Sequence, residues 1–379
     1  MINTEMLIGR DLGDDDYFSE NCLAVGTRLA EFEITGVIGE GGFGIVYMTF
    51  DHSLRRPVAL KEYMPTSIAL RGPDQNVLVR ARRHQPTFDT GLKSFINEAR
   101  ILAQFDHPSL IKVHRFWEQN QTAYMAMRYY EGSTLKEIIE HDPASVDEVW
   151  LRPIMESILG ALDTLYTENI LHRDISPDNI LILETGEAVL LDFGSARQVI
   201  SDLSQSLTVI LKPGYAPIEQ YADDITMTQG PWTDLYSLSA VMYLAITKQP
   251  PPTSVARMVT DTMRTLADGN HPGFDRPFLA AIDRGLLIRP DQRPQTIEAF
   301  RKLLQLGSDL LAKPALGGRA KPIKLPAPQL VPDHAAHRQR SPQKKPTRIT
   351  PAMPRVALLA IAAGLLVIVL GIAVWLLRT

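Results

Sequence analysis

The middle of the chain carries a tightly spaced pattern of polar and apolar residues. Two short apolar runs, Ile180–Leu183 and Val189–Leu191, flank a polar Glu-Thr-Gly-Glu turn, which predicts a β-hairpin. Asn179 precedes the first run and Asp192 follows the second, so a hairpin would bring both side chains to one end. An amide and a carboxylate are hard oxygen ligands that suit Mg²⁺. Asp174, five residues before Asn179, is near enough to orient a hydroxyl nucleophile.

This stretch resembles the catalytic loop and metal loop of protein kinases. His-Arg-Asp at 172–174 followed by Asn179 matches H-R-D-x-x-x-x-N, and Asp-Phe-Gly at 192–194 matches D-F-G. The resemblance implies that Asp174 orients the substrate hydroxyl, and that Asn179 and Asp192 hold Mg²⁺, which Mn²⁺ can replace. An ordinary hairpin with solvated acids is the alternative, but it leaves the other kinase motifs of the chain unexplained.

A glycine-rich run at 39–44 lies between two segments of β-type residues. Glycines lack a β-carbon and let backbone amides approach phosphate oxygens. A Rossmann site also uses such a run, but a helix follows it there, whereas Ile45–Phe50 predicts a strand here. By resemblance, this strand–turn–strand flap covers the phosphates of ATP. The residues expected in it are Gly39, Glu40, Gly41, Gly42, Phe43, Gly44 and Val46.

Val-Ala-Leu-Lys at 58–61 matches the lysine motif of the third strand in kinases. Lys61 needs a carboxylate partner, and Glu98 is the best candidate because apolar residues recur at helical spacing around it. The resemblance implies that Lys61 positions the α- and β-phosphates while Glu98 holds Lys61. A surface lysine and a surface glutamate are the alternative.

The stretch between Lys61 and Glu98 is longer than in most kinases. It begins Lys-Glu-Tyr-Met-Pro and contains the basic residues Arg80, Arg82 and Arg83. Together with the His-Arg-Asp-Ile-Ser-Pro-Asp-Asn loop and a Gly-Tyr-Ala-Pro-Ile-Glu-Gln-Tyr segment, it resembles a bacterial, eukaryotic-like branch of Ser/Thr kinases. The insert is either a partner surface or a solvated loop, and the sequence leaves both open.

The apolar run from Ala123 to Tyr130 predicts a strand that ends in a polar turn. By resemblance it leads into the hinge between two lobes, with Met127 as gatekeeper and the main chain of Arg128 and Tyr130 bonding adenine. The same residues could be plain core in another fold. The side chains expected to sandwich the base are Val46, Ala59 and Leu181.

Motifs of a helical lobe follow. Helical spacing over Val149–Thr167 predicts a buried helix before the catalytic loop, and similar patterns occur near 276–288 and 296–306. By resemblance, Asp234 begins a central helix and supports the catalytic loop, and Arg293 pairs with the closing glutamate, Glu219.

Two positions depart from the family pattern. Most Ser/Thr kinases carry a lysine two residues after the catalytic aspartate, where it approaches the transferring phosphate, and a threonine seven residues before the closing glutamate. This chain has Ser176 and Lys212 there. The residue types look exchanged, which implies that Lys212 supplies the catalytic cation from the opposite loop and that Ser176 is its hydrogen-bond partner. An exposed Lys212 in a slower enzyme is the alternative.

The resemblance implies an α+β, bilobal fold of the protein-kinase type. A polar leader at 1–25 precedes a kinase domain at 26–306, with a β-rich lobe at 26–128 and a helical lobe at 131–306. Hydrophobic residues form 45% of the chain, enough for a sizeable core. The single cysteine, Cys22, excludes a disulfide within the chain and a cysteine zinc site.

The composition changes at residue 307. Nine prolines and ten Lys or Arg within 313–355 predict an extended linker over 307–355. The following segment, 356–377, has 22 residues without a charge and is long enough to span a bilayer as a helix. Residues 307–379 contain 11 Lys or Arg and 2 Asp or Glu, a net charge of +9, which leaves −13 on the rest of the chain.

A basic linker beside an apolar span favours lipid headgroups over nucleic acid as its partner. We therefore expect a single-pass protein of the inner (cytoplasmic) membrane with its kinase domain in the cytoplasm. The predicted function is ATP-dependent transfer of a phosphoryl group to protein serine or threonine hydroxyls, and a homodimer that phosphorylates itself is compatible with it. A nucleotide-binding pseudokinase scaffold is the main alternative, and a small-molecule kinase is a weaker one.

Overall fold

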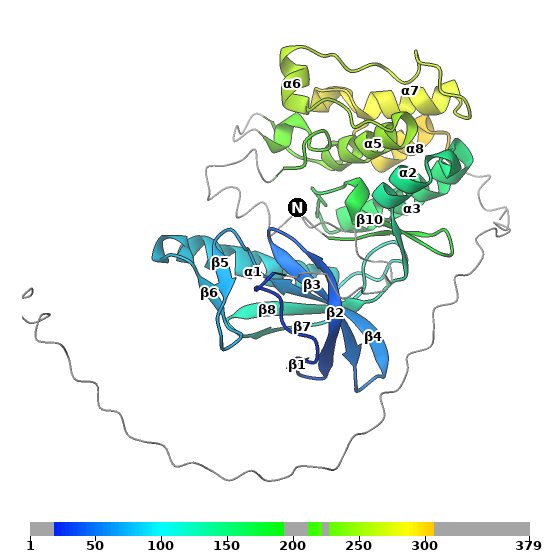
Figure 1. The fold of residues 1–379 in the computed structure, drawn as a ribbon. Helices are drawn as coiled ribbons and strands as arrows, with labels where there is room; N and C mark the ends of the chain where they lie inside the picture. The colour runs from blue at the N-terminus through cyan, green and yellow to red at the C-terminus, as the bar shows by residue number, and fades with distance from the viewer. Residues whose placement is uncertain (1–18, 193–210, 222–226, 307–379) are drawn as a thin grey trace, which may run out of the picture. The chain divides into compact units, whose positions relative to one another are not determined.

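The computed structural model describes residues 19–192, 211–221 and 227–306. These residues form a β-rich lobe followed in sequence by a helical lobe (Figure 1). The expected bilobal α+β architecture is confirmed for this part of the chain.

The elements of both lobes have the following bounds. The strands are β1 (Arg28–Leu29), β2 (Phe32–Glu40), β3 (Gly44–Asp51), β4 (Arg56–Tyr63), β5 (Ala69–Arg71), β6 (Val77–Val79), β7 (Val113–Gln119), β8 (Thr122–Arg128), β9 (Gly132–Thr134), β10 (Ile180–Leu183) and β11 (Ala188–Leu190). The α-helices are α1 (Gln85–Leu102), α2 (Leu135–His141), α3 (Glu148–Tyr166), α5 (Pro231–Thr247), α6 (Ser254–Val259), α7 (Arg276–Gly285) and α8 (Ile297–Leu303). Short 3-10 helices are η1 (Arg82–His84), η2 (Pro143–Ser145), η3 (Pro177–Asn179), η5 (Ile218–Gln220) and η6 (Pro290–Gln292).

The main sheet is antiparallel and has the strand order β1-β2-β3-β4-β8-β7. It curls so that side chains at the start of β2 reach β7: the Phe32 and Trp117 rings stack with centroids 5.5 Å apart, and Arg115 Nη1 lies 2.6 Å from Glu31 Oε1. Helix α1 packs on strands β7 and β8 through an apolar face that includes Phe95. The curled sheet and this helix enclose the core of the lobe.

The insert after Lys61 forms a second sheet, the hairpin β5–β6, instead of a solvated loop. Its Arg71 forms an ion pair with Glu62, and Glu62 also accepts hydrogen bonds from the hydroxyls of Tyr47 (2.8 Å) and Tyr124 (2.7 Å). Both charged side chains are almost fully buried, with exposed fractions of 6% for Arg71 and 0% for Glu62. The hairpin is thus fixed to the sheet by a buried polar network.

Residues 19–25, assigned to the leader on the basis of sequence, pack against the same network. Arg71 Nε donates to the backbone oxygen of Asn21 at 2.9 Å, and the backbone N–H of Leu23 donates to Tyr47 Oη at 3.1 Å. Leu23 is 4% exposed. The packed lobe therefore begins before residue 26, because one buried leucine and a few backbone hydrogen bonds hold this short polar segment.

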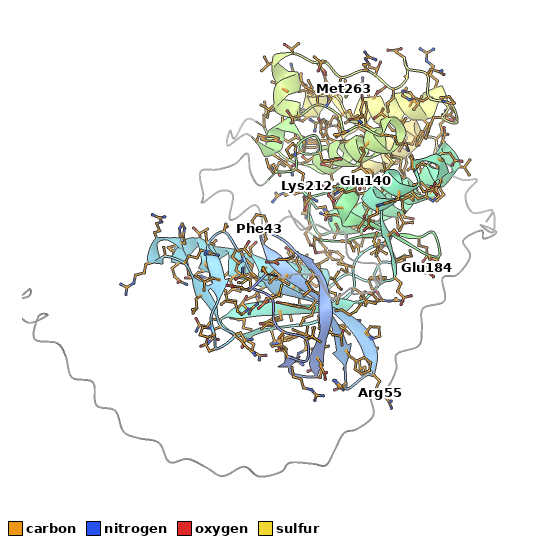
Figure 2. All side chains as sticks on the ribbon, in the orientation of Figure 1. Phe43, Arg55, Glu140, Glu184, Lys212 and Met263 are labelled. Carbon is orange, nitrogen blue, oxygen red and sulfur yellow. The ribbon has the colours of Figure 1, made fainter. Side chains whose placement is uncertain are left out.

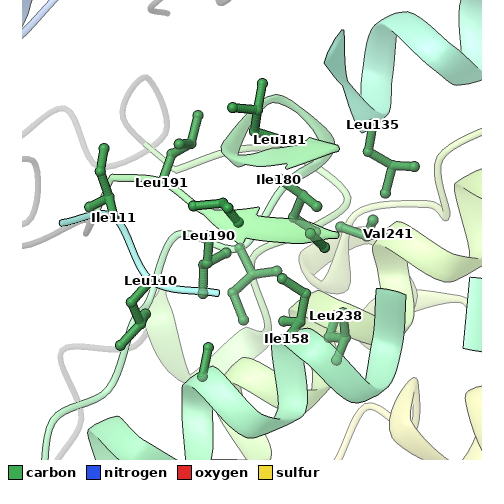
Figure 3. Packing of buried hydrophobic residues seen from close by; sticks show 14 of the residues in the cluster. Leu110, Ile111, Leu135, Ile158, Ile180, Leu181, Leu190, Leu191, Leu238 and Val241 are labelled. Atoms are coloured by element: carbon green, nitrogen blue, oxygen red, sulfur yellow. The ribbon is translucent and has the colours of Figure 1, made fainter. Parts of the chain in front are cut away.

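The helical lobe is built around α3 and α5. Helix α5 is apolar on nearly all sides and is buried along most of its length, as expected for a helix at the centre of a domain. Figure 3 shows the β10–β11 hairpin packed over these helices, with Ile180 and Leu190 close to Ile158 and Leu238. The hairpin predicted from sequence is confirmed, with Leu181 opposite Val189.

No helix within residues 19–192, 211–221 and 227–306 is long and apolar enough to cross a membrane. The linker at 307–355 and the predicted span at 356–377 lie outside the described residues, as does the leader up to residue 18.

Candidate active site

Lys61 lies at the centre of a cluster of charged side chains. Its Nζ is 3.4 Å from Glu98 Oε1 and 2.9 Å from Asp192 Oδ1. Strand β4 positions the lysine and helix α1 positions the glutamate, which is 1% exposed. The predicted Lys61–Glu98 pair is confirmed as a contact. The additional contact with Asp192 joins the β-rich lobe to the end of the β10–β11 hairpin.

The glycine-rich turn connects β2 to β3. Gly39 pairs with Val46, Glu40 pairs with Ile45, and the Gly41 N–H donates to the Gly44 oxygen at 2.9 Å to close the turn. Gly44 is required for steric reasons, because a β-carbon there would lie 2.5 Å from the backbone oxygen of Glu62. The close approach of strand β4, rather than a positive φ, explains this glycine.

A cleft lies next to this turn, and the space within it, including the part open to solvent, is about 590 Å³. Residues from the turn, from the connection after β8 and from the β10–β11 hairpin contribute to it. The lining consists of Ile38, Gly39, Val46, Ala59, Ile111, Met127, Arg128, Tyr130, Asn179, Leu181, Leu191 and Asp192.

A buried carboxylate supports the loop from His172 to Asn179. Asp234, near the N-terminus of α5, accepts the backbone N–H of His172 at 2.8 Å and of Arg173 at 2.7 Å. The Tyr166 hydroxyl donates to the same carboxylate at 3.0 Å. Arg173 has a φ of +65°, a conformation that is costly for a residue with a β-carbon. The bonds to Asp234 stabilise this bent backbone and confirm the supporting role predicted for Asp234.

The side chain of His172 ties this loop to the end of β11. The backbone N–H of Asp174 donates to His172 Nδ1 at 3.3 Å, so Nε2 carries the proton and donates to the Leu191 oxygen at 3.3 Å. Burial lowers the pKa of His172, which favours this neutral form. The imidazole therefore links the backbone oxygen of Leu191, which precedes Asp192, to the backbone N–H of Asp174.

Asp174 and Asn179 contact one another directly. Asn179 Nδ2 donates to the side-chain oxygen Oδ2 of Asp174 at 2.8 Å and to its backbone oxygen at 2.8 Å. The backbone N–H of Leu191 donates to the backbone oxygen of Asn179 at 2.8 Å. This bond brings Asn179 to the same end of the hairpin as Asp192. The predicted convergence of these polar side chains is confirmed.

Asn179 and Asp192 suit a divalent cation. Within the described parts of the chain, no group of three or more His, Cys, Asp or Glu side chains could hold a metal. Mg²⁺ does not require one, because it usually binds one or two carboxylates together with water and substrate phosphates. Asn179 uses its Nδ2 for Asp174, so its amide oxygen is the atom that can ligate a cation. Both side chains line the same cleft.

Ser176 and Lys212 meet across two loops. Lys212 Nζ donates to Ser176 Oγ at 2.5 Å and lies 3.5 Å from Asp178 Oδ2. Figure 2 labels Lys212 in the helical lobe and Phe43 at the tip of the glycine-rich turn. The predicted partnership of Ser176 with Lys212 is present as a hydrogen bond.

Comparisons with known proteins agree with this geometry. The family model described as "Protein kinase domain" matches residues 32–302. The chain belongs to the protein kinase family. The match covers both lobes and includes the elements that carry Lys61, Glu98, Asp174, Asn179 and Asp192.

Similar proteins include bacterial serine/threonine-protein kinases. PknB of Mycobacterium leprae is 28% identical over 281 residues, which are 71% of this chain and 42% of that protein. PknL of Mycobacterium tuberculosis is 30% identical over 329 residues, which are 83% of this chain and 74% of that protein. The chain therefore matches about two fifths of PknB and about three quarters of PknL.

Solved structures show the same fold. The structure "PpkA-294 apo form" is 49% identical, has a TM-score of 0.71, and the match covers 75% of this chain and 99% of that one. The kinase domain of Mycobacterium tuberculosis PknI is 21% identical with a TM-score of 0.56, over 75% of this chain and 99% of that one, and it supports the fold alone.

The kinase domain brings about half of the predicted nucleotide residues into the lining of the cleft, and Lys61 lies outside this lining but contacts Asp192, which is part of it. Of those in the glycine-rich turn, Gly39 and Val46 line it, whereas Glu40, Gly41, Gly42, Phe43 and Gly44 are not part of the lining. Sequence reasoning missed Ile38, Ile111 and Leu191. Ile38 and Leu191 directly precede Gly39 and Asp192, and this adjacency to a motif is the signal that could have identified them.

A second buried ion pair fixes the segment after Lys212. Arg293 Nη1 lies 2.6 Å from Glu219 Oε1, and both side chains are fully buried. Arg293 also donates to the backbone oxygens of Leu287 (2.6 Å) and Ile288 (2.7 Å). The predicted Glu219–Arg293 pair is confirmed, and its position away from the cleft makes it structural.

Proposed function

We propose that this chain is a serine/threonine protein kinase that transfers the γ-phosphoryl group of ATP to a hydroxyl group of a protein. One observation carries the proposal: Lys61 contacts both Glu98 and Asp192 at a cleft that Asn179 and Asp192 line. Protein kinases use this lysine–glutamate pair and these two polar ligands for phosphoryl transfer.

Each side chain has a role in this reaction. Lys61, held by Glu98, binds the α- and β-phosphates, while Val46, Ala59 and Leu181 enclose the adenine. Mg²⁺ held by Asn179 and Asp192 would neutralise charge on the phosphate oxygens. The glycine-rich turn covers the phosphates and excludes water.

Asp174 acts on the acceptor. It orients the substrate hydroxyl and takes its proton as the new oxygen–phosphorus bond forms and the bond from the γ-phosphorus to the β-bridging oxygen breaks. Asn179 holds the Asp174 carboxylate in place through its 2.8 Å hydrogen bond. Positioning and electrostatic stabilisation supply most of the catalysis in such transfers.

The pseudokinase alternative is not favoured. Pseudokinases commonly lack the lysine or one of the metal ligands, whereas Lys61, Asn179 and Asp192 are all present. Lys61 is also already held by two carboxylates.

Phosphate transfer by the purified full-length chain in detergent tests this proposal. Labelled ATP with Mg²⁺ should label serine or threonine of added protein or of the chain itself. Asp192→Ala and Lys61→Met should each lower the rate by about 10²-fold or more, as expected when a group that stabilises developing charge is lost. Wild-type chain that binds nucleotide but labels nothing would favour the pseudokinase scaffold.

We also propose that the chain is anchored in the inner (cytoplasmic) membrane. The uncharged segment 356–377 and the basic linker before it support a single span with the kinase domain in the cytoplasm and with anionic lipid headgroups beside the linker. Protein substrates, and a second copy of the chain for autophosphorylation, would then be reached from the cytoplasm.

Fractionation tests the anchor. The full chain should sediment with membranes and need detergent for extraction, whereas a chain lacking 356–379 should be soluble and active. Recovery of the full chain in the soluble fraction without detergent would contradict the span.

A further inference from the structure

The contact between Lys212 and Ser176 lies beside the residues that act on the acceptor hydroxyl. Ser176 follows Asp174 by two residues and is fully buried. A buried hydroxyl needs a hydrogen-bond partner, and Lys212 Nζ is such a partner at 2.5 Å. The Lys212 side chain is only 18% exposed. A mostly buried ammonium group is therefore held against the loop that carries Asp174.

One carboxylate, that of Asp178, lies beside this ammonium group. Asp178 Oδ2 lies 3.5 Å from Lys212 Nζ, at the long end of a hydrogen bond. The other oxygen of Asp178 lies 3.4 Å from Lys136 Nζ, on α2. Asp178 is thus shared by Lys136 and Lys212, and the Lys212 ammonium group is held between Asp178 and Ser176.

The backbone of Lys212 is rigidly held. Pro213 and Gly214, with φ +87°, occupy the central positions of a tight turn, and the Tyr215 N–H donates to the Lys212 oxygen at 3.1 Å. Pro followed by Gly with positive φ is the pattern of a type II turn. The hydroxyl of Ser237, in α5, donates to the Tyr215 oxygen at 2.9 Å. The turn thus presents Lys212 from a fixed platform.

A cation at this point suits phosphoryl transfer. Negative charge is spread over the equatorial oxygens of the transferring group, and preorganised cations in sites of low water content stabilise it most effectively. Lys61 approaches ATP from the β-rich lobe, whereas Lys212 lies with the catalytic loop on the acceptor side.

We propose that Lys212 is a catalytic residue that contacts the transferring phosphoryl group in the transition state, with Ser176 positioning its ammonium group. The inference rests on the proposed kinase function. In this proposal, the positive charge that stabilises the transferring phosphoryl group on the acceptor side comes from the turn at 212–215. It does not come from the loop that carries Asp174.

Steady-state kinetics of the full-length chain in detergent test it. Lys212→Met should lower kcat by about 10²–10³-fold, the loss typical for one donor to a developing oxyanion. The KM for ATP should change little, because the proposed contact is made in the transition state, whereas the melting temperature should fall modestly, because the buried Ser176 hydroxyl loses its partner. Lys136→Met is the matched control: it removes the same charge beside Asp178 and should keep kcat near the wild-type value.

Exchange of the two side chains provides a second readout. The double variant Ser176→Lys with Lys212→Thr returns a cation to the same contact from the opposite loop, so its kcat should exceed that of Lys212→Thr by at least tenfold. A structural role for Lys212 would not produce such a recovery.

Three results would overturn the inference: an active wild type with Lys212→Met within threefold of its kcat, an equal loss in Lys136→Met, or a double variant no faster than Lys212→Thr. A wild-type chain that transfers no phosphate would instead refute the proposed function. The two failures are therefore distinguishable.

Discussion

Replacement of Arg71 by Met should strongly destabilise the β-rich lobe. Arg71 forms two hydrogen bonds to the fully buried Glu62 and others to the backbone oxygens of Asn21 (2.9 Å) and Gln75 (3.0 Å). Without the guanidinium group, the Glu62 carboxylate would stay buried with only two tyrosine hydroxyls. Breaking a buried pair by removing one partner costs about 3–5 kcal/mol. That is a large part of the roughly 5–15 kcal/mol that stabilises a typical domain.

Arg115→Met is a matched control for the effect of burial. Arg115 forms an ion pair of similar length with Glu31 (2.6 Å), but the two side chains are 46% and 28% exposed. Exposed pairs contribute about 0–1 kcal/mol, and the contact of Arg115 with the Trp117 ring adds about 0.5–1 kcal/mol. We therefore expect a loss of about 1 kcal/mol from this variant.

Urea unfolding of residues 1–310, followed by tryptophan fluorescence, measures both losses. Adding Glu62→Gln to Arg71→Met should recover much of the stability, because the uncompensated charge disappears while an acceptor for the tyrosines remains. Equal losses in Arg71→Met and Arg115→Met would refute the reasoning from burial.

Two further predictions concern the helical lobe. Burial lowers the pKa of His172, so on acidification the unfolded state binds a proton before the folded state does. The free energy of unfolding should therefore fall as the pH drops below about 6.5, the ordinary pKa of histidine. This one group can contribute at most about 1.4 kcal/mol per pH unit. Unfolding measured from pH 7.5 to 5.5 should show a shallower dependence in His172→Asn, and an unchanged slope would contradict a neutral buried histidine. Gly285→Ala should cost about 1–3 kcal/mol, since its β-carbon would lie 2.0 Å from Ser239 Oγ. Thermal unfolding should show partial recovery with Ser239→Ala, and no recovery would rule out this contact as the cause.

Local patterning and the order of known motifs allowed the most reliable predictions. The β10–β11 hairpin follows from apolar runs on either side of a turn, and its pairing fixes where Asn179 and Asp192 lie. Motif order predicted the Lys61–Glu98 contact although a long insert separates the two residues. The exchange of residue types between the family positions now occupied by Ser176 and Lys212 predicted the hydrogen bond between them.

Contacts made by short irregular segments could not be predicted. Leu23 lies in a short segment without helical or strand periodicity, and nothing in it indicates that Tyr47 accepts its backbone N–H. The insert did contain a usable signal, because a Gly-Pro-Asp-Gln-Asn turn between apolar runs favours a hairpin. Its buried Arg71 was not predictable, since an isolated arginine usually remains at the surface.

The support that Asp234 gives to the catalytic loop also sets an order of events during synthesis. His172 and Arg173 leave the ribosome 62 and 61 residues before the aspartate that accepts their N–H groups. At about 5–20 residues per second, this delay lasts roughly 3–12 s. Arg173 cannot be held in its left-handed conformation during that time. A nascent chain would therefore acquire its catalytic loop only after α5 has emerged, which delays phosphoryl transfer until most of the helical lobe has been made.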